Sequence, residues 1–138
     1  MSFYVTPLIH QLVISNIAST ITSYLASALR NIFSSNERPD NREKELDRLQ
    51  MNRLMKWMDM FFQEETTDIP IKNAYRQELY NIYKTIASDY KQYENWKRYN
   101  KSLWFMPTYR QKNTNWLAQK ILDDLVLFHE GVNLFSKC

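Results

Sequence analysis

The residue types that most often perform catalysis or bind metals are scarce in this chain of 138 residues. It has two histidines, His10 and His129, and one cysteine, Cys138. A structural zinc site needs four ligands, and a di-iron helical bundle needs two Glu-x-x-His motifs. The residues three positions before the histidines are Pro7 and Val126, so that motif does not occur. We therefore expect no metal site.

Acidic residues that could act in pairs are adjacent in sequence, as in Asp123–Asp124 and Glu64–Glu65. Neighbouring side chains on a helix diverge by about 100°, which separates such pairs. The chain also has a single glycine, Gly131, where average usage would give roughly ten. Phosphate-binding loops and nucleophile elbows need glycine at tight backbone positions. The sequence therefore predicts a protein that is not an enzyme and uses no cofactor.

The segment 90–112 departs furthest from average composition. It has six basic residues and one acid, a local charge of +5 in a chain of net charge +3. Tyrosine, tryptophan and phenylalanine alternate with these cations. Cations neutralise phosphates and aromatic rings stack on unpaired bases, so nucleic acid is one predicted partner. The predicted contact residues are Lys91, Trp96, Lys97, Arg98, Tyr99, Lys101, Trp104, Arg110 and Lys112.

Other interpretations of segment 90–112 stay open. Tryptophan and tyrosine beside basic residues also suit a lipid headgroup region, and aromatic residues with arginine suit a protein interface. Part of the segment has a structural explanation, because Tyr90 and Tyr93 continue the apolar stripe of the preceding helix. Residues 104–106 could equally close one end of a helical bundle.

The N-terminal region has no Asp, Glu, Lys or Arg before Arg30. Frequent Ser, Thr and Asn make it too polar for a membrane span, and it has no basic start typical of a signal peptide. Helical spacing gathers one apolar face and an opposite face of hydroxyl groups. The alternatives are a core helix, a helix on a membrane surface, or a helix on a partner. The apolar face consists of Ile14, Ile17, Ile21, Leu25 and Ile32.

Four helices are predicted, at about 8–33, 40–63, 70–100 and 114–135. Prolines lie in or beside the breaks, and apolar residues recur at helical spacing from Ile71 to Tyr93 and from Leu117 to Phe135. Gly131 should mark fraying or a close helix contact. We expect an all-α, four-helix bundle-like single domain over residues 1–138, with its N-terminal helix docked or projecting.

These observations predict a non-enzymatic helical structural or interaction subunit of a larger assembly. Other protein subunits are the expected partners, in a homo- or hetero-oligomer. A nucleic-acid-binding module and a peripheral membrane protein are the alternatives. The single cysteine fits a reducing intracellular compartment or a virus particle, and secretion is not expected. High Asn, Ile and Tyr content is typical of an AT-rich genome, which suggests a minor structural component of a virus particle.

Overall fold

The computed structural model describes residues 17–32, 42–65, 68–102 and 107–137, the last range with side chains from Thr114 onward. Within these ranges the chain is almost entirely helical and contains no strand, which confirms the all-α, bundle-like prediction. The predicted helix start at residue 8 lies outside the described residues. The helices are residues 17–32, α2 (Arg42–Arg48), α3 (Met51–Glu64), α4 (Pro70–Ser102) and α5 (Pro107–Lys137).

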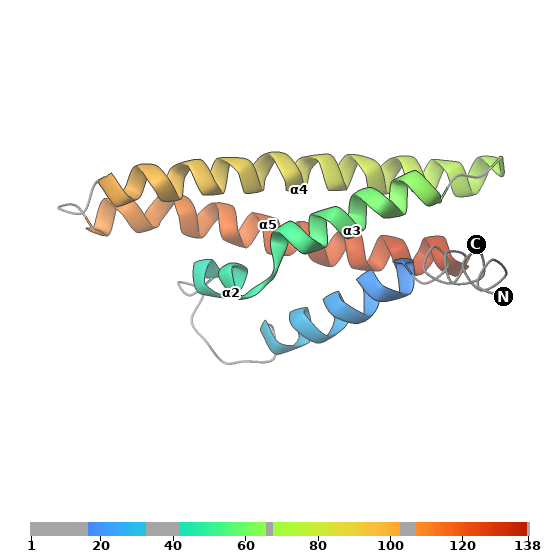
Figure 1. Ribbon diagram of the computed structural model, residues 1–138, viewed down its shortest axis with the longest axis horizontal. Helices are drawn as coiled ribbons and strands as arrows, with labels where there is room; N and C mark the ends of the chain where they lie inside the picture. Colours follow the sequence, from blue (N-terminus) through green and yellow to red (C-terminus); the bar gives the residue numbers. More distant parts are fainter. Residues whose placement is uncertain (1–16, 33–41, 66–67, 103–106, 138) are drawn as a thin grey trace, which may run out of the picture.

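The two longest helices form an antiparallel hairpin that runs the length of the molecule (Figure 1). At 1.5 Å per residue, α4 is about 50 Å long and α5 about 46 Å. The shorter helices α2, α3 and 17–32 pack against this hairpin (Figure 1). Their apolar side chains and the inward faces of α4 and α5 form one continuous core.

Gly131 lies at a close contact between α5 and the side chain of Leu79 on α4, which is one of the two roles predicted from sequence. A Cβ atom at this position would lie 2.5 Å from Cδ2 of Leu79 on α4. The glycine has an ordinary helical backbone, since no glycine in the described chain has a positive φ. Gly131 therefore serves packing, by leaving space for Leu79.

The predicted helix 40–63 is wrong as a single element, because it is divided into α2 and α3 at Leu49 and Gln50. Leu49 and Met51 are both buried. Two residues apart on one helix their side chains would diverge by about 200°, so a continuous helix could not bury both on one face. The break at residues 49–50 turns the second helix, so that both side chains can point into the core. Within it, the backbone N–H of Gln50 donates to the hydroxyl of Tyr24, at 3.0 Å, in helix 17–32.

The predicted start of the last helix at residue 114 is also wrong, because α5 begins at Pro107. Proline suits a first helical position, where its missing N–H would have no partner within the helix. The sequence interpretation placed Pro107 at the centre of a long break, so it did not predict the first two turns of α5, residues 107–113. At the other side of this connection α4 continues to Ser102, two residues beyond its predicted end.

The helix at residues 17–32 is docked on the hairpin. Its apolar stripe is buried and belongs to the common core. Beside it, an aromatic cluster fills the space between α3, α4 and α5, with edge-to-face contacts such as Phe61–Phe135 at 5.4 Å and Phe62–Phe128 at 6.1 Å between ring centroids. Such contacts add to the burial of large rings and fix their orientation.

Candidate interaction surfaces

The basic aromatic segment lies where α4 ends and α5 begins, at one end of the hairpin. Trp104 lies outside the described residues, and Arg110 and Lys112 belong to α5 without described side chains. The remaining predicted contact residues all lie on the last three turns of α4. The structure therefore places Lys91, Trp96, Lys97, Arg98, Tyr99 and Lys101 on a single helix.

Part of this segment serves the fold, because Tyr93 and Lys97 anchor α2 to α4. The Tyr93 hydroxyl donates to Oδ1 of Asp47 at 2.9 Å, and Lys97 Nζ lies 2.6 Å from Oδ2 of the same carboxylate. Burial, followed by the hydrogen bond to Asp47, raises the pKa of Tyr93 well above its usual range. Tyr90 stacks on Tyr93 with 6.0 Å between centroids. Lys97 is therefore already paired within the molecule.

Most of the other predicted contact residues on α4 are exposed. Lys91, Arg98 and Lys101 are exposed, and Tyr99 is 51% exposed. Trp96 is half-buried and contacts Tyr99 edge-to-face at 5.5 Å. Both rings line an open depression of about 320 Å³ together with Gln92 and Asn95. The predicted cations and rings are thus partly free to contact a partner.

The apolar face predicted for the N-terminal helix is not on the surface. Ile17, Ile21, Leu25 and Ile32 are buried in the core, and Ile14 lies outside the described residues. The alternatives from sequence were a core helix, a membrane-surface helix and a partner-binding helix. Residues 17–32 form a core helix. No helix in the described chain has the length and apolar content to cross a membrane.

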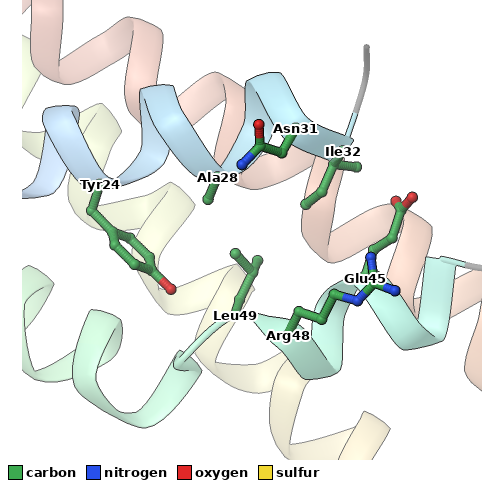
Figure 2. Close-up of a pocket in the computed structure, with 7 residues that line it drawn as sticks. All are labelled: Tyr24, Ala28, Asn31, Ile32, Glu45, Arg48 and Leu49. Atoms are coloured by element: carbon green, nitrogen blue, oxygen red, sulfur yellow. The ribbon is translucent and has the colours of Figure 1, made fainter. Parts of the chain in front are cut away.

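A more enclosed pocket of about 270 Å³ lies between helix 17–32 and α2. Figure 2 shows its lining residues, with Tyr24 and Ile32 on one side and Leu49 and Arg48 on the other. The Glu45 carboxylate beside it is only 2% exposed and lies 2.8 Å from a guanidinium nitrogen of Arg42. Its charge is therefore neutralised locally. The remaining lining residues are Ala28 and Asn31, so the seven include no histidine, cysteine or second acid.

An acidic pair at the α4–α5 contact was missed by the sequence interpretation. Asp89 is buried and accepts from Lys120 Nζ at 2.7 Å. Asp124 lies one turn along α5, and its buried Oδ2 has no hydrogen-bond partner among the described residues. Burial is the main cause that raises the pKa of Asp124, Lys120 lowers it, and Asp89 and Asp123 raise it further. The sequence signal that could have revealed this cluster was the spacing of Lys120 and Asp124, because residues four apart on a helix lie side by side.

Three large apolar side chains are exposed in a line along α5. Trp116 is 65% exposed, Leu127 51% and Leu134 52%. The steps from Trp116 of 11 and 18 residues correspond to about three and five turns, so all three point to the same side of α5. With the residues that share this side they form what we call the outer face of α5, defined as Trp116, Lys120, Asp123, Leu127, Glu130 and Leu134.

The outer face continues onto the flank of α4. Lys120 contacts Asp89, and Trp96 lies seven residues beyond Asp89, on the same side of α4. Trp116 is one turn before Lys120 on the outer face. Trp96 and Trp116 therefore lie on one side of the hairpin.

The described residues contain no group of three or more His, Cys, Asp or Glu side chains placed to hold a metal ion. No protein-family model matches this chain, and comparisons with curated proteins and with solved structures gave no match either. Its surfaces are therefore the basis for a functional proposal.

Proposed function

We propose that this protein is a non-enzymatic structural or interaction subunit that binds another protein through the outer face of α5. The observation that carries this proposal is the row of Trp116, Leu127 and Leu134, each more than half exposed on one side of a helix. Isolated apolar side chains are common on protein surfaces, whereas three large ones aligned on one side of a single helix favour an interaction site.

The composition of the outer face supports a protein partner. Tryptophan is enriched among the residues that dominate binding energies, and charged residues at an interface set orientation and specificity. Here Lys120, Asp123 and Glu130 lie among the apolar positions. A face of this kind fits a partner helix, whose side chains would pack between those of α5.

The test is capture of partners from the native source by tagged full-length chain, followed by cross-linking and mass spectrometry. The variant Leu127→Glu/Leu134→Glu should lose the cross-linked partners, because two charges would enter an apolar contact. The control is Met60→Glu, since Met60 is an exposed apolar residue on α3, 39% accessible. Equal capture by all three proteins would contradict the proposal, as would a wild-type chain that binds nothing, itself included.

Membership of a virus particle is a more specific form of this proposal. It is supported by the Asn-, Ile- and Tyr-rich composition and by the adhesive outer face. Detection of the chain in purified, protease-treated particles would support it. Its recovery only in the fraction outside particles would contradict it.

A second candidate function is nucleic-acid binding at the end of α4, favoured by exposed Arg98 and Lys101 beside the exposed ring of Tyr99. The charge-reversal variant Lys91→Glu/Arg98→Glu/Lys101→Glu spares Lys97 and its ion pair with Asp47.

If this function is right, wild-type affinity for single-stranded DNA should fall steeply with salt in a mobility-shift series. The variant should bind at least tenfold more weakly. The control reverses three exposed cations elsewhere, Arg30, Lys56 and Lys84. Equal losses in both variants would indicate nonspecific attraction and contradict a site at this end.

A further inference from the structure

The outer face of α5 has the residue spacing of a coiled-coil seam. Its positions follow one another at alternating steps of 4 and 3 residues, and the same steps continue backward from Trp116 to Asn113 and Tyr109. A repeat of 3.5 residues keeps a seam in contact with a facing helix over several turns. Most of the charged and apolar positions of this seam are exposed. Half of its eight positions are polar or charged, so a facing helix would have to match both the apolar positions and the charges.

We infer that the occupant is a second copy of this chain, with the two α5 helices antiparallel and a two-fold axis near residues 121–122. This inference rests on the proposed function and names its partner. Residue 122 is the midpoint of α5 (Pro107–Lys137), so this arrangement overlaps the two helices along their whole length. A two-fold dimer uses the same surface on both copies.

Charge complementarity selects the antiparallel orientation. In a parallel pair each seam position faces its own equivalent, so Lys120 would face lysine and Asp123 would face aspartate. In the antiparallel pair Lys120 of one copy faces Asp123 of the other. Opposite charges across an interface favour the correct orientation and like charges disfavour the wrong one. Lys120 would thus join its own Asp89, 2.7 Å away, to a carboxylate of the second copy.

The apolar positions are complementary in the same register. Trp116 faces Leu127 of the second copy, and Leu134 faces position 109, a tyrosine. Glu130 faces position 113, an asparagine. No position in this register places a charge opposite a large apolar residue or a like charge. A shift of one heptad, by contrast, would place Asp123 opposite Leu127.

The overlap of the two α5 helices is long: from position 109 to position 134 the seam extends about 38 Å. Trp96 and Tyr99 at the end of α4 add further exposed ring surface beside one end of the seam. Pairing would also cover apolar surface that is exposed in the single chain.

The first test measures the mass of the full-length chain by light scattering and sedimentation over a wide concentration range. The wild-type chain should dimerise. Leu127→Glu should weaken dimerisation at least tenfold, because the new carboxylate would face Trp116. Met60→Glu on α3 should leave the dimer constant within twofold, and thermal melts should show that both variants stay folded. A wild-type chain that is monomeric at every concentration overturns the inference.

The second test examines the register by disulfide cross-linking in a Cys138→Ser background. Asn113→Cys/Glu130→Cys should form covalent dimers on mild oxidation, since 113 faces 130 of the second copy. The two cysteines are about 26 Å apart within one chain, too far to bridge. The matched control Asn113→Cys/Lys137→Cys is displaced by one heptad from position 130, lies far from the two-fold axis, and should stay uncross-linked. Cross-linking of the control instead overturns the proposed pairing.

Failure of this inference differs from failure of the proposed function. A strictly monomeric chain whose other captured protein is lost in Leu127→Glu/Leu134→Glu would leave the outer face as an interaction site and exclude self-pairing. A dimer that dissociates in Leu127→Glu supports both. A dimer that is insensitive to Leu127→Glu overturns the inference.

Discussion

The inner and outer faces of α5 carry similar apolar residues with opposite surroundings. On the inner face, Leu117, Leu125 and Phe128 are at most 4% exposed and contact the other helices. On the outer face, Trp116, Leu127 and Leu134 are more than half exposed. Hydrophobicity therefore does not determine which side of this helix is covered within the chain. The inner face forms part of the core, and the outer face is exposed and proposed to bind a partner, so substitutions on the two should separate stability from association.

The largest effect is expected for Phe128→Ala on the inner face. Phe128 is fully buried and contacts the rings of Phe61 and Phe62. Loss of a buried aromatic ring leaves a cavity and should lower the free energy of unfolding by about 3–5 kcal/mol. Urea unfolding of dilute protein measures this change. A loss below about 1 kcal/mol would show that the inner face is not the packed core.

The next effect concerns Gly131, at the edge where α5 meets α4. Gly131→Ala places a Cβ against Leu79 and should destabilise by about 1 kcal/mol, because strain exceeds the gain in helix propensity. The same change in a Leu79→Ala background should instead stabilise by up to about 1 kcal/mol, since the space is then free. Equal effects in both backgrounds would refute the packing role of this glycine.

Asp124 lies on α5 between the inner and outer faces, and its partly buried carboxyl makes the stability of the protein depend on pH. Burial raises the pKa of its carboxyl. The folded state therefore holds this proton more tightly, and the resulting stability is present below the unfolded pKa and is lost as the pH rises through the folded pKa. Asp124→Asn should gain stability relative to wild type as pH rises from 4 to 7, by less than about 1.4 kcal/mol per pH unit.

Urea midpoints measured at each pH provide this test, with Asp123→Asn, an exposed neighbour on α5, as the control. The control should show a smaller change in relative stability over the same range. A difference between Asp124→Asn and wild type that stays constant with pH would exclude the buried-carboxyl explanation.

The smallest effect on stability is expected on the outer face. Leu127→Ala should change the free energy of unfolding of the dilute monomer by less than about 0.5 kcal/mol, as is usual for exposed positions. The same variant should weaken association measured at high concentration. If it destabilised the monomer by more than 2 kcal/mol, the division of α5 into two faces with separate roles would be wrong.

The helices and the core could be predicted from sequence wherever apolar residues recur at helical spacing. The stripe from Leu117 to Phe135 identified the core side of α5, and the stripe on α4 identified its buried Leu79, Ile86 and Tyr93, but Ile71 at the start of that stripe is 63% exposed. The break at Leu49 could not be read from turn residues, because it contains neither glycine nor proline. The only sequence signal was the spacing of Leu49 and Met51, two apolar residues only two positions apart. On a continuous helix this spacing looks like one wide apolar face, so the break was not recognised.

The candidate site was only partly predictable. Composition identified the cations of segment 90–112 but could not show that Lys97 is paired with Asp47, fifty residues earlier in sequence. The outer face was missed because its apolar residues are separated by charged ones. Residue type does not reveal whether an apolar side chain finds a neighbour in its own chain, and only the arrangement of helices decides this.

The hydrogen bond from the Gln50 N–H to the Tyr24 hydroxyl gives the molecule an internal reporter. This amide lies between α2 and α3, and its described acceptor belongs to a different helix. Its exchange with solvent deuterium should therefore follow the undocking of residues 17–32 and not the fraying of its own neighbours. One backbone amide can thus time how often the N-terminal helix leaves the hairpin while the other helices stay folded.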